Sequence, residues 1–262
     1  MDFAYTPEQE SLREEVRQFI ADNITPEMRE EMEESGIRRR GPQVDALYKK
    51  ISENGWIGIS WPEEYGGQDG SRIDQYIVEE EFARIGITVG GAGSGAPAIL
   101  AAGTEEQKKY FLPGLINGEI IFALGFTEPQ AGADLAGLQC RAVRDGDEWV
   151  INGQKMYTTA AHYGTHIYLM ARTDPDAPRH RGITIFLVPM ETEGITVRPL
   201  WTIQNEPTAP LGTTYGDRRT NEVFFENVRI PASYMLGEEN MGWYVAVSYT
   251  HLRAHETLRY LV

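Results

Sequence analysis

This 262-residue sequence has few of the features that mark secreted or nucleic-acid-binding proteins. Its single cysteine, Cys140, cannot form an internal disulfide bond, so we expect a reducing compartment and a packing role for the thiol. Lysine and arginine number 24 against 39 aspartates and glutamates, and the net charge of −15 argues against a surface for nucleic acid. We expect the one basic run, residues 38–40, to be a solvated loop.

Long hydrophobic runs are also missing. The N-terminal residues MDFAYTPEQESLREE are acidic and have no apolar segment of the kind found in signal peptides. No window approaches the roughly 20 apolar residues that a membrane-spanning helix needs. The composition, 41% hydrophobic and 10% aromatic, is that of a globular protein. We therefore expect a cytoplasmic protein with no membrane span.

Several familiar motifs are incomplete. The run GGAGSG, residues 90–95, follows a helical pattern and lacks the third glycine of a dinucleotide-binding fingerprint, so we interpret it as a connection between helices. His162 and His166 are four residues apart, but they lie in a loop running into a strand without further ligands nearby, which argues against a metal site. No nucleophile elbow or P-loop is present, so covalent catalysis has no visible carrier.

The first half of the chain has helical periodicity. The patterns TPEQ (residues 6–9) and TEEQ (residues 104–107) are capping boxes, and each predicts the start of a helix. Further helices are predicted at about residues 44–54, 71–85 and 97–102. Residues 1–118 are therefore predicted to form an α-helical domain.

After residue 118 the apolar period shortens from 3.6 residues to 2, which is typical of strands. Strands are predicted at residues 120–126, 139–144, 148–157, 167–172, 183–189, 195–200 and 221–225. The tripeptide DGD at residues 145–147 predicts a tight hairpin turn, and residues 202–220 predict a long loop. Residues 119–233 are thus predicted to form a middle β domain, a small barrel or sandwich, which gives an α+β fold class.

Two polar stretches interrupt strands in a way that suits a ligand. They are FTEPQAGAD at residues 126–134 and GQKMYTT at residues 153–159. Proline and small residues at a strand end release main-chain N–H groups, which a planar ligand with carbonyl and ring-nitrogen acceptors could use. Thr127 and Thr159 could add hydroxyls, and Tyr157 could cover the ligand with its ring. From the residues alone, the alternative is that both stretches are ordinary turns.

At these residues the sequence resembles the acyl-CoA dehydrogenase family. FTEPQAGAD is similar to the family segment T-E-P-x-A-G-S-D, and DGDEWVINGQKMYTT is similar to its strand pair ending in N-G-x-K-x-[W/Y]-I-T. TNEVFFENVRIP resembles the segment before its C-terminal helices, and GWIGISWPEEYGG and EEQKKYFLPGLINGE resemble its N-terminal domain. The five segments occur in the family's order, and the resemblance extends to about Val247.

The resemblance implies a cofactor and the residues that hold it. FAD would lie between the middle β domain and a C-terminal helical bundle. Phe126 would contribute backbone contacts, Thr127 a hydrogen bond to the isoalloxazine ring, and Thr159 a hydrogen bond close to flavin N5. Tyr157 would lie against the flavin. Ala133 stands where the family commonly has a serine that contacts the cofactor or the CoA ester, so we expect a substrate-binding position lacking one hydrogen bond of about 1 kcal/mol.

The implied reaction is α,β-dehydrogenation of an acyl-CoA thioester. A carboxylate removes the α-proton while the β-hydrogen leaves as hydride to flavin N5. The electrons would then pass to an electron-transfer flavoprotein, and the full-length protein would be a homo-oligomer. The alternatives are a catalytically inactive fragment that binds flavin or a partner, and a relative that works as a flavin monooxygenase or nitroalkane oxidase.

The C-terminal end departs from the family pattern. Residues 234–247 resemble the start of the C-terminal helical domain, whereas SYTHLRAHETLRYLV, residues 248–262, looks like a translated sequencing adapter. We interpret it as a non-family tail and expect the helical bundle, with its catalytic glutamate, to be missing. Glu256 lies in that tail and is not assigned as the base, so no catalytic residue is assigned in this chain.

Overall fold

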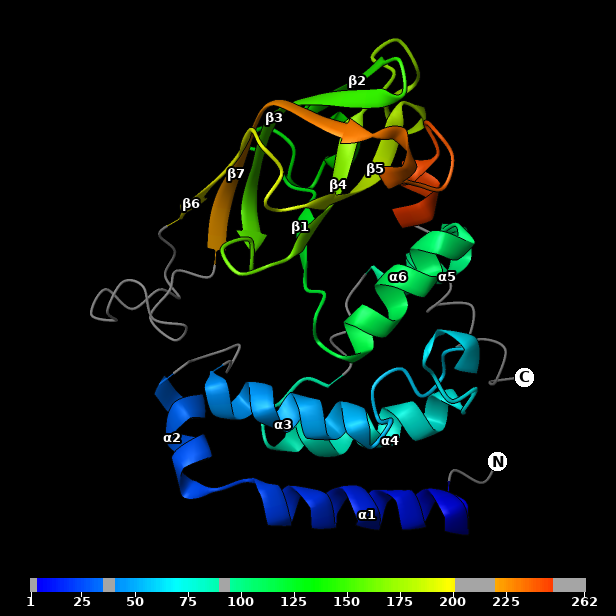
Figure 1. Cartoon of the computed structure of the whole chain (residues 1–262), viewed down its shortest axis with the longest axis vertical. Helices are drawn as coiled ribbons and strands as arrows, with labels where there is room; N and C mark the ends of the chain where they lie inside the picture. Colours follow the sequence, from blue (N-terminus) through cyan, green and yellow to red (C-terminus); the bar gives the residue numbers. More distant parts are fainter. Residues whose placement is uncertain (1–3, 35–40, 90–94, 201–219, 247–262) are drawn as a thin grey trace. The chain divides into compact units, whose positions relative to one another are not determined.

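The computed structural model describes residues 4–34, 41–89, 95–200 and 220–246, which fold into two compact units (Figure 1). A helical unit contains the described residues up to 89 together with residues 112–119. A sheet unit contains residues 95–111 and the remaining described residues from Ile120 onward. The division falls inside one helix, between Phe111 and Leu112.

The helices of the described residues largely match those expected from the sequence. They are α1 (Pro7–Asn23), α2 (Pro26–Glu34), α3 (Pro42–Glu53), α4 (Arg72–Arg84), α5 (Ala96–Ala102) and α6 (Glu105–Ile116). Both predicted capping boxes are confirmed. The side chain of Thr6 accepts from Gln9 N while Gln9 accepts from Thr6 N, and Thr104 and Gln107 make the same exchange. Each box satisfies two of the free N–H groups at its helix start.

Helix α2 is the one that the sequence pattern did not predict. Its residues, PEMREEMEE, show no apolar stripe, yet Glu31 gives it a definite structural role. The Glu31 carboxylate accepts from the backbone N–H groups of Gln43 and Val44, at 2.9–3.1 Å, at the start of α3. The N-cap residue of α3 is Gly41, which has no side chain to cap with. A carboxylate from a neighbouring helix therefore caps α3.

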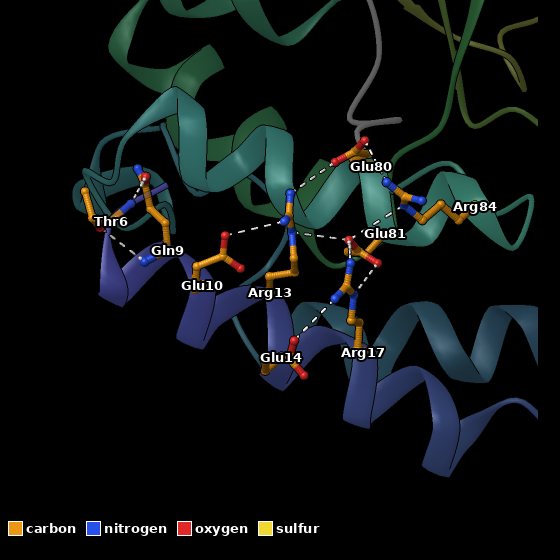
Figure 2. A network of polar contacts seen from close by, with 9 residues as sticks. All are labelled: Thr6, Gln9, Glu10, Arg13, Glu14, Arg17, Glu80, Glu81 and Arg84. Atoms are coloured by element: carbon orange, nitrogen blue, oxygen red, sulfur yellow. Dashed lines mark hydrogen bonds and ion pairs between the residues drawn. The ribbon is translucent and has the colours of Figure 1, made fainter. Parts of the chain in front are cut away.

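Helices α1 and α4 are joined by a network of charges around Glu81 (Figure 2). The Glu81 carboxylate is 4% exposed and accepts two hydrogen bonds from Arg17, each 3.0 Å long. Arg13 approaches it to 3.4 Å and Arg84 to 3.7 Å. Beside this network the helices also share an apolar contact, between the rings of Phe19 and Phe82, whose centroids are 6.1 Å apart.

The second unit is built on one mixed sheet. Its strands are β1 (Phe122–Gly125), β2 (Arg141–Asp145), β3 (Glu148–Thr159), β4 (His166–Arg172), β5 (Ile183–Pro189), β6 (Ile195–Pro199), β7 (Thr220–Pro231) and β8 (Met235–Leu236). The strand order is β6-β7-β3-β2-β4-β5-β8, with β1 paired to β4 (Figure 1). The β1–β4 and β2–β4 pairs are parallel and the others antiparallel. The predicted fold class, helices followed by a β domain, is confirmed.

The hairpin predicted at residues 145–147 is confirmed, because β2 and β3 pair antiparallel around Gly146, whose φ is +62°. Two features of the sheet differ from the sequence prediction. Strand β7 continues to Pro231 rather than ending at residue 225, and the two-residue strand β8 was not predicted. The extension of β7 contains a bulge in which Asn227 has a φ of +52°, and the polar pair Glu226 and Asn227 interrupts the alternation that predicted the strand.

Cys140 packs in the core of the sheet with Trp149, Ile151 and Phe186, as the sequence predicted. Burial raises the pKa of its thiol to about 11, against the opposing charge of Lys155. Gly153 lies against it. With a φ of +148°, and with a Cβ that would fall 2.7 Å from Cys140 Cα, this position accepts only glycine without movement.

Four predictions lie largely or wholly outside the described residues: the basic run at residues 38–40, the glycine-rich connection from residue 90, the loop from residue 202 and the tail at residues 248–262. Residues 242–246, in the segment that resembles the start of a C-terminal helical domain, are helical. In the part of the chain that the structure describes, no helix is both long and apolar enough to cross a membrane.

Candidate functional site

The two interrupted segments singled out from the sequence lie next to each other in the sheet unit. Strand β1 ends at Gly125, and the backbone then passes beside β3. The N–H of Met156 donates to the carbonyl of Thr127 at 2.8 Å, and Lys155 Nζ donates to the carbonyl of Phe126 at 3.2 Å. Residues 126–127 and 155–156 are thus held side by side.

A tight turn follows at residues 128–131. The N–H of Glu128 donates to Ala131 O at 3.0 Å, and the N–H of Ala131 donates back to Glu128 O at 3.1 Å. Pro129 and Gln130 form its exposed tip. Ala133 lies beyond this turn on an exposed stretch, followed by Asp134, which forms an ion pair with Arg179. The predicted substrate position is therefore on a surface loop next to the site.

Strand β3 has a bulge at Tyr157. Lys155 pairs with Val223 and Thr158 pairs with Asn221, so two β3 residues oppose the single residue between them on β7. Tyr157 is 58% exposed and has a φ of +56°, a left-handed conformation that costs a non-glycine residue about 1–2 kcal/mol. The chain therefore maintains a strained backbone at the position that presents this ring to solvent.

Two adjacent threonines follow, on opposite faces of the strand. Thr158 is fully buried, and among the described residues its hydroxyl oxygen has no hydrogen-bond partner. Its carbonyl accepts from Asn221 Nδ2 at 3.2 Å. Thr159 is only half-buried, as is Thr127. Of the two adjacent threonines, the one that the sequence analysis selected is the partly exposed one.

The site lies over a buried ion pair that sequence reasoning did not select. Lys155 Nζ is 2.7 Å from Glu128 Oε1, and the two side chains are 0% and 1% exposed. The signal was present in the alternation of β3, because Lys155 falls in the inward series that begins with Trp149 and Ile151. A lysine at an inward position of a strand needs a buried anion, and Glu128 supplies it.

Aromatic rings form the other side of this region. The ring of Phe126 packs against Tyr168, with centroids 5.6 Å apart, and Tyr168 contacts Phe122 at 6.3 Å. Phe122 in turn contacts His166 at 6.0 Å. Burial raises the pKa of the Tyr168 hydroxyl and lowers the pKa of His166. The segment that ends β1 is thus supported by packed rings.

The two histidines lie where the sequence placed them, in a turn and at the start of a strand. His162 Nδ1 is 3.1 Å from Asn221 Nδ2, and His166 Nδ1 is 3.0 Å from the hydroxyl of Thr165. In the described ranges no three histidine, cysteine or acidic side chains are grouped so as to hold a metal ion.

Comparison with known proteins places the chain in a family. Residues 6–119 match the family model of the acyl-CoA dehydrogenase N-terminal domain, and residues 123–228 match that of the acyl-CoA dehydrogenase middle domain. The sequence is 41% identical over 249 residues to acyl-CoA dehydrogenase FadE26 of Mycobacterium tuberculosis, an alignment that covers 93% of this chain and 59% of that protein.

Solved structures agree. A chain of the ChsE4-ChsE5 complex from Mycobacterium tuberculosis superposes with a TM-score of 0.80 at 38% identity, covering 96% of this chain and 61% of the other. A chain in the structure of the electron transferring flavoprotein of Acidaminococcus fermentans gives a TM-score of 0.77 at 28% identity, covering 95% and 63%. This chain belongs to the acyl-CoA dehydrogenase family, and it spans about three fifths of the length of the relatives that it matches.

Proposed function

We propose that this chain binds FAD and belongs to a cytoplasmic enzyme that introduces a double bond between the α and β carbons of an acyl-CoA thioester. One observation carries the proposal. The hydrogen bond from Met156 N to Thr127 O joins the two segments that the family resemblance assigns to the flavin. The two segments are about thirty residues apart in the sequence, and this hydrogen bond brings them side by side, where one ligand can contact both.

The donors present fit an isoalloxazine ring. The carbonyl oxygens of Phe126 and Thr127 already accept hydrogen bonds inside the protein. The surface groups of the site are two half-buried hydroxyls, from Thr127 and Thr159, and the exposed ring of Tyr157. A flat ligand whose edge is rich in carbonyl and ring-nitrogen acceptors needs hydroxyl and N–H donors and a ring to pack against.

Each residue has a distinct part in the proposed chemistry. FAD, when bound, supplies the acceptor for the hydride from the β carbon. Thr127 and Thr159 hold its edge, Phe126 contributes main-chain contacts, and Tyr157 covers the ring. Ala133, which is on an exposed loop, would lie beside the bound acyl-CoA. The base that removes the α-proton is not assigned to any residue of this chain.

The proposed electron acceptor is an electron-transfer flavoprotein, and the proposed assembly of the full-length protein is a homo-oligomer. The similarity to a chain in the structure of the electron transferring flavoprotein of Acidaminococcus fermentans supports an acceptor of that kind. The similarity to a chain of the ChsE4-ChsE5 complex supports assembly with other subunits, and the identity of those subunits in the homo-oligomer rests on the family resemblance alone. The acyl-CoA dehydrogenase name of FadE26 supports the substrate class.

Adjacent threonines offer a matched test of the flavin site. Thr159→Val should raise the dissociation constant for FAD about tenfold through loss of a hydrogen bond, whereas Thr158→Val should leave it unchanged. The two changes are isosteric and concern neighbouring residues, but Thr158 is buried and Thr159 is partly exposed. Titration of the FAD-free chain with FAD, followed by flavin fluorescence, measures both. Equal constants for the parent and Thr159→Val would remove Thr159 from the site.

The reaction is tested separately, with the full-length enzyme. Anaerobic addition of acyl-CoA should bleach the visible absorbance of the oxidised flavin. Reduction by a nitroalkane, or oxygen-dependent product formation, would favour the oxidase or monooxygenase alternative. FAD binding without reduction by any of these would favour an inactive flavin-binding protein.

A further inference from the structure

The buried pair of Glu128 and Lys155 occupies the point where the two site segments meet. Lys155 Nζ reaches the Glu128 carboxylate at 2.7 Å and the carbonyl of Phe126 at 3.2 Å. The next residue of β3, Met156, donates its N–H to the next carbonyl, that of Thr127. Two consecutive residues of one segment thus hold two consecutive carbonyls of the other.

Glu128 is suited to this place because it must accept four hydrogen bonds. Its two oxygens accept from the N–H of Gln139 at 2.6 Å, the N–H of Cys140 at 2.9 Å and the side-chain amide of Gln130 at 2.8 Å, in addition to Lys155. Only an ionised carboxylate offers acceptor sites for four donors, since an amide would turn its own NH₂ toward one of them. The carboxylate therefore fixes the turn, the start of the following segment and the ammonium together.

Lys155 acts on the Phe126–Thr127 peptide, whose N–H we propose as the main-chain donor of this segment to the flavin edge. The carbonyl of Phe126 and the N–H of Thr127 belong to the same peptide group. An ammonium bonded to that carbonyl in a buried setting polarises the peptide and strengthens the N–H as a donor. The same contact prevents the peptide from rotating, because its oxygen is held by a side chain with no exposed surface.

We propose that Glu128 and Lys155 are a positioning pair for the flavin site: they fix and polarise the Phe126–Thr127 peptide and set its register against Met156 and Tyr157. The proposal rests on the proposed function for its ligand, while the geometry on which it depends is internal to the chain. A buried ion pair is weak evidence for stability, because burying both charges offsets most of their attraction. The contact of Lys155 with the Phe126 carbonyl gives the pair a second role, which is to position that peptide.

The double variant Glu128→Gln, Lys155→Met removes both charges together and keeps the side-chain volumes close to those of the parent. Lys155→Met alone is the second variant, because it leaves the carboxylate with its three remaining donors if the double variant does not fold. The matched control is Arg229→Met on β7, which breaks exposed ion pairs to Asp145 and Glu148 in the same sheet. Two readouts are needed, hydrogen exchange of the FAD-free chain and the dissociation constant for FAD.

The expected result is local. Exchange in residues 126–131 and 155–159 should speed up on the order of tenfold, with residues 183–189 of β5 unchanged. The dissociation constant for FAD should rise on the order of tenfold, and the reduction potential of bound FAD should become more negative because a donor to the ring is weakened. The Arg229→Met control should move none of these.

Unchanged exchange at residues 126–131, or exchange that rises equally across the sheet, would overturn the positioning role. So would an unchanged dissociation constant for FAD in variants whose exchange is locally faster. Failure of the parent chain to bind FAD would refute the proposed function instead, and in that case the exchange result still decides whether the pair holds the peptide.

Discussion

Each unit of the molecule buries a carboxylate, and the two carboxylates are held in different ways. Glu81 in the helical unit is 4% exposed and Glu128 in the sheet unit is 3% exposed. The partners of Glu81 are three arginines, whose side chains are 16%, 44% and 57% exposed (Figure 2). The charged partner of Glu128 is Lys155, which has no exposed surface.

The comparison shows what decides the cost of removing a buried carboxylate charge. Whether its basic partners can then reach water matters more than how many partners there are. If Glu81 loses its charge, Arg17 and Arg84 can turn to water with little loss, since exposed ion pairs contribute about 0–1 kcal/mol each. If Glu128 loses its charge, Lys155 remains enclosed by protein, and an unpaired buried charge is costly. The network with more ion pairs is therefore expected to tolerate a substitution better.

The largest effect is expected for Glu128→Gln. This change should lower the free energy of unfolding of the sheet unit by about 3–5 kcal/mol, because it leaves a buried ammonium without its counter-charge. Hydrogen exchange of β3 and β5, which pack in the core of that sheet, measured at increasing urea concentrations, reports it. A loss below about 1 kcal/mol would contradict the expected cost of leaving the buried Lys155 ammonium without its partner.

A smaller effect is expected for Glu81→Gln, about 1–2 kcal/mol in the helical unit, since two of its three arginines can be rehydrated. Added salt should reduce the difference between this variant and the parent, because partly exposed pairs are screened and buried ones are not. Hydrogen exchange in α1 and α4 reports it. A loss as large as that of Glu128→Gln would break the comparison.

The bulge provides a third prediction, in the opposite direction. Tyr157→Gly should stabilise the FAD-free sheet unit by about 1 kcal/mol, because glycine adopts the left-handed conformation without strain. Tyr157→Ala keeps the strained backbone and loses the same ring, so it serves as the control. Both variants should weaken FAD binding. Comparing their thermal unfolding separates the effect of losing the ring from the effect of relieving the backbone strain. An equal melting temperature for both would contradict the strain at this residue.

The smallest effect concerns acid. Burial holds the pKa of His166 below its usual 6.5, against an opposing influence of Glu191. The unfolded chain therefore binds a proton before the folded one does, so the contribution of His166 is present above about pH 6.5 and is lost as the pH falls further. His166→Gln should make the stability of the sheet unit less sensitive between about pH 7 and pH 5. If the stability of variant and parent changed with pH to the same extent, His166 would not be the source of the acid sensitivity.

Local patterns were enough to predict much of the fold. Capping boxes at Thr6 and Thr104 and the period of 2 after residue 118 are written in adjacent residues, so their helices and strands were found. Helix α2 was missed because its role depends on Glu31 capping another helix. Strand β8 was missed because two residues carry no period of their own.

The site was partly predictable for the same reason. The segments containing Thr127 and Tyr157 are visible as interruptions of strands, but the hydrogen bonds that join them connect residues about thirty apart. Glu128 belongs to the segment FTEPQAGAD and Lys155 to the segment GQKMYTT. Only the folded sheet shows that the two residues form a pair. A charged residue at an inward-facing position of a predicted strand is the signal that points to Lys155.

One contact in the sheet unit also constrains the order in which the chain can fold. Gln107 on α6 is buried, and its side-chain amide donates to the carbonyls of Ser233 and Met235, which lie 126 and 128 residues later. At roughly 5–20 residues per second, ribosomes make the second half of this contact about 6–25 s after the first. Until then the side-chain amide of Gln107 has only water to donate to, so the contact of α6 with residues 233–235 forms after the other strands have been synthesised. During synthesis on the ribosome, the contact of α6 with residues 233–235 is thus one of the last to form in the sheet unit.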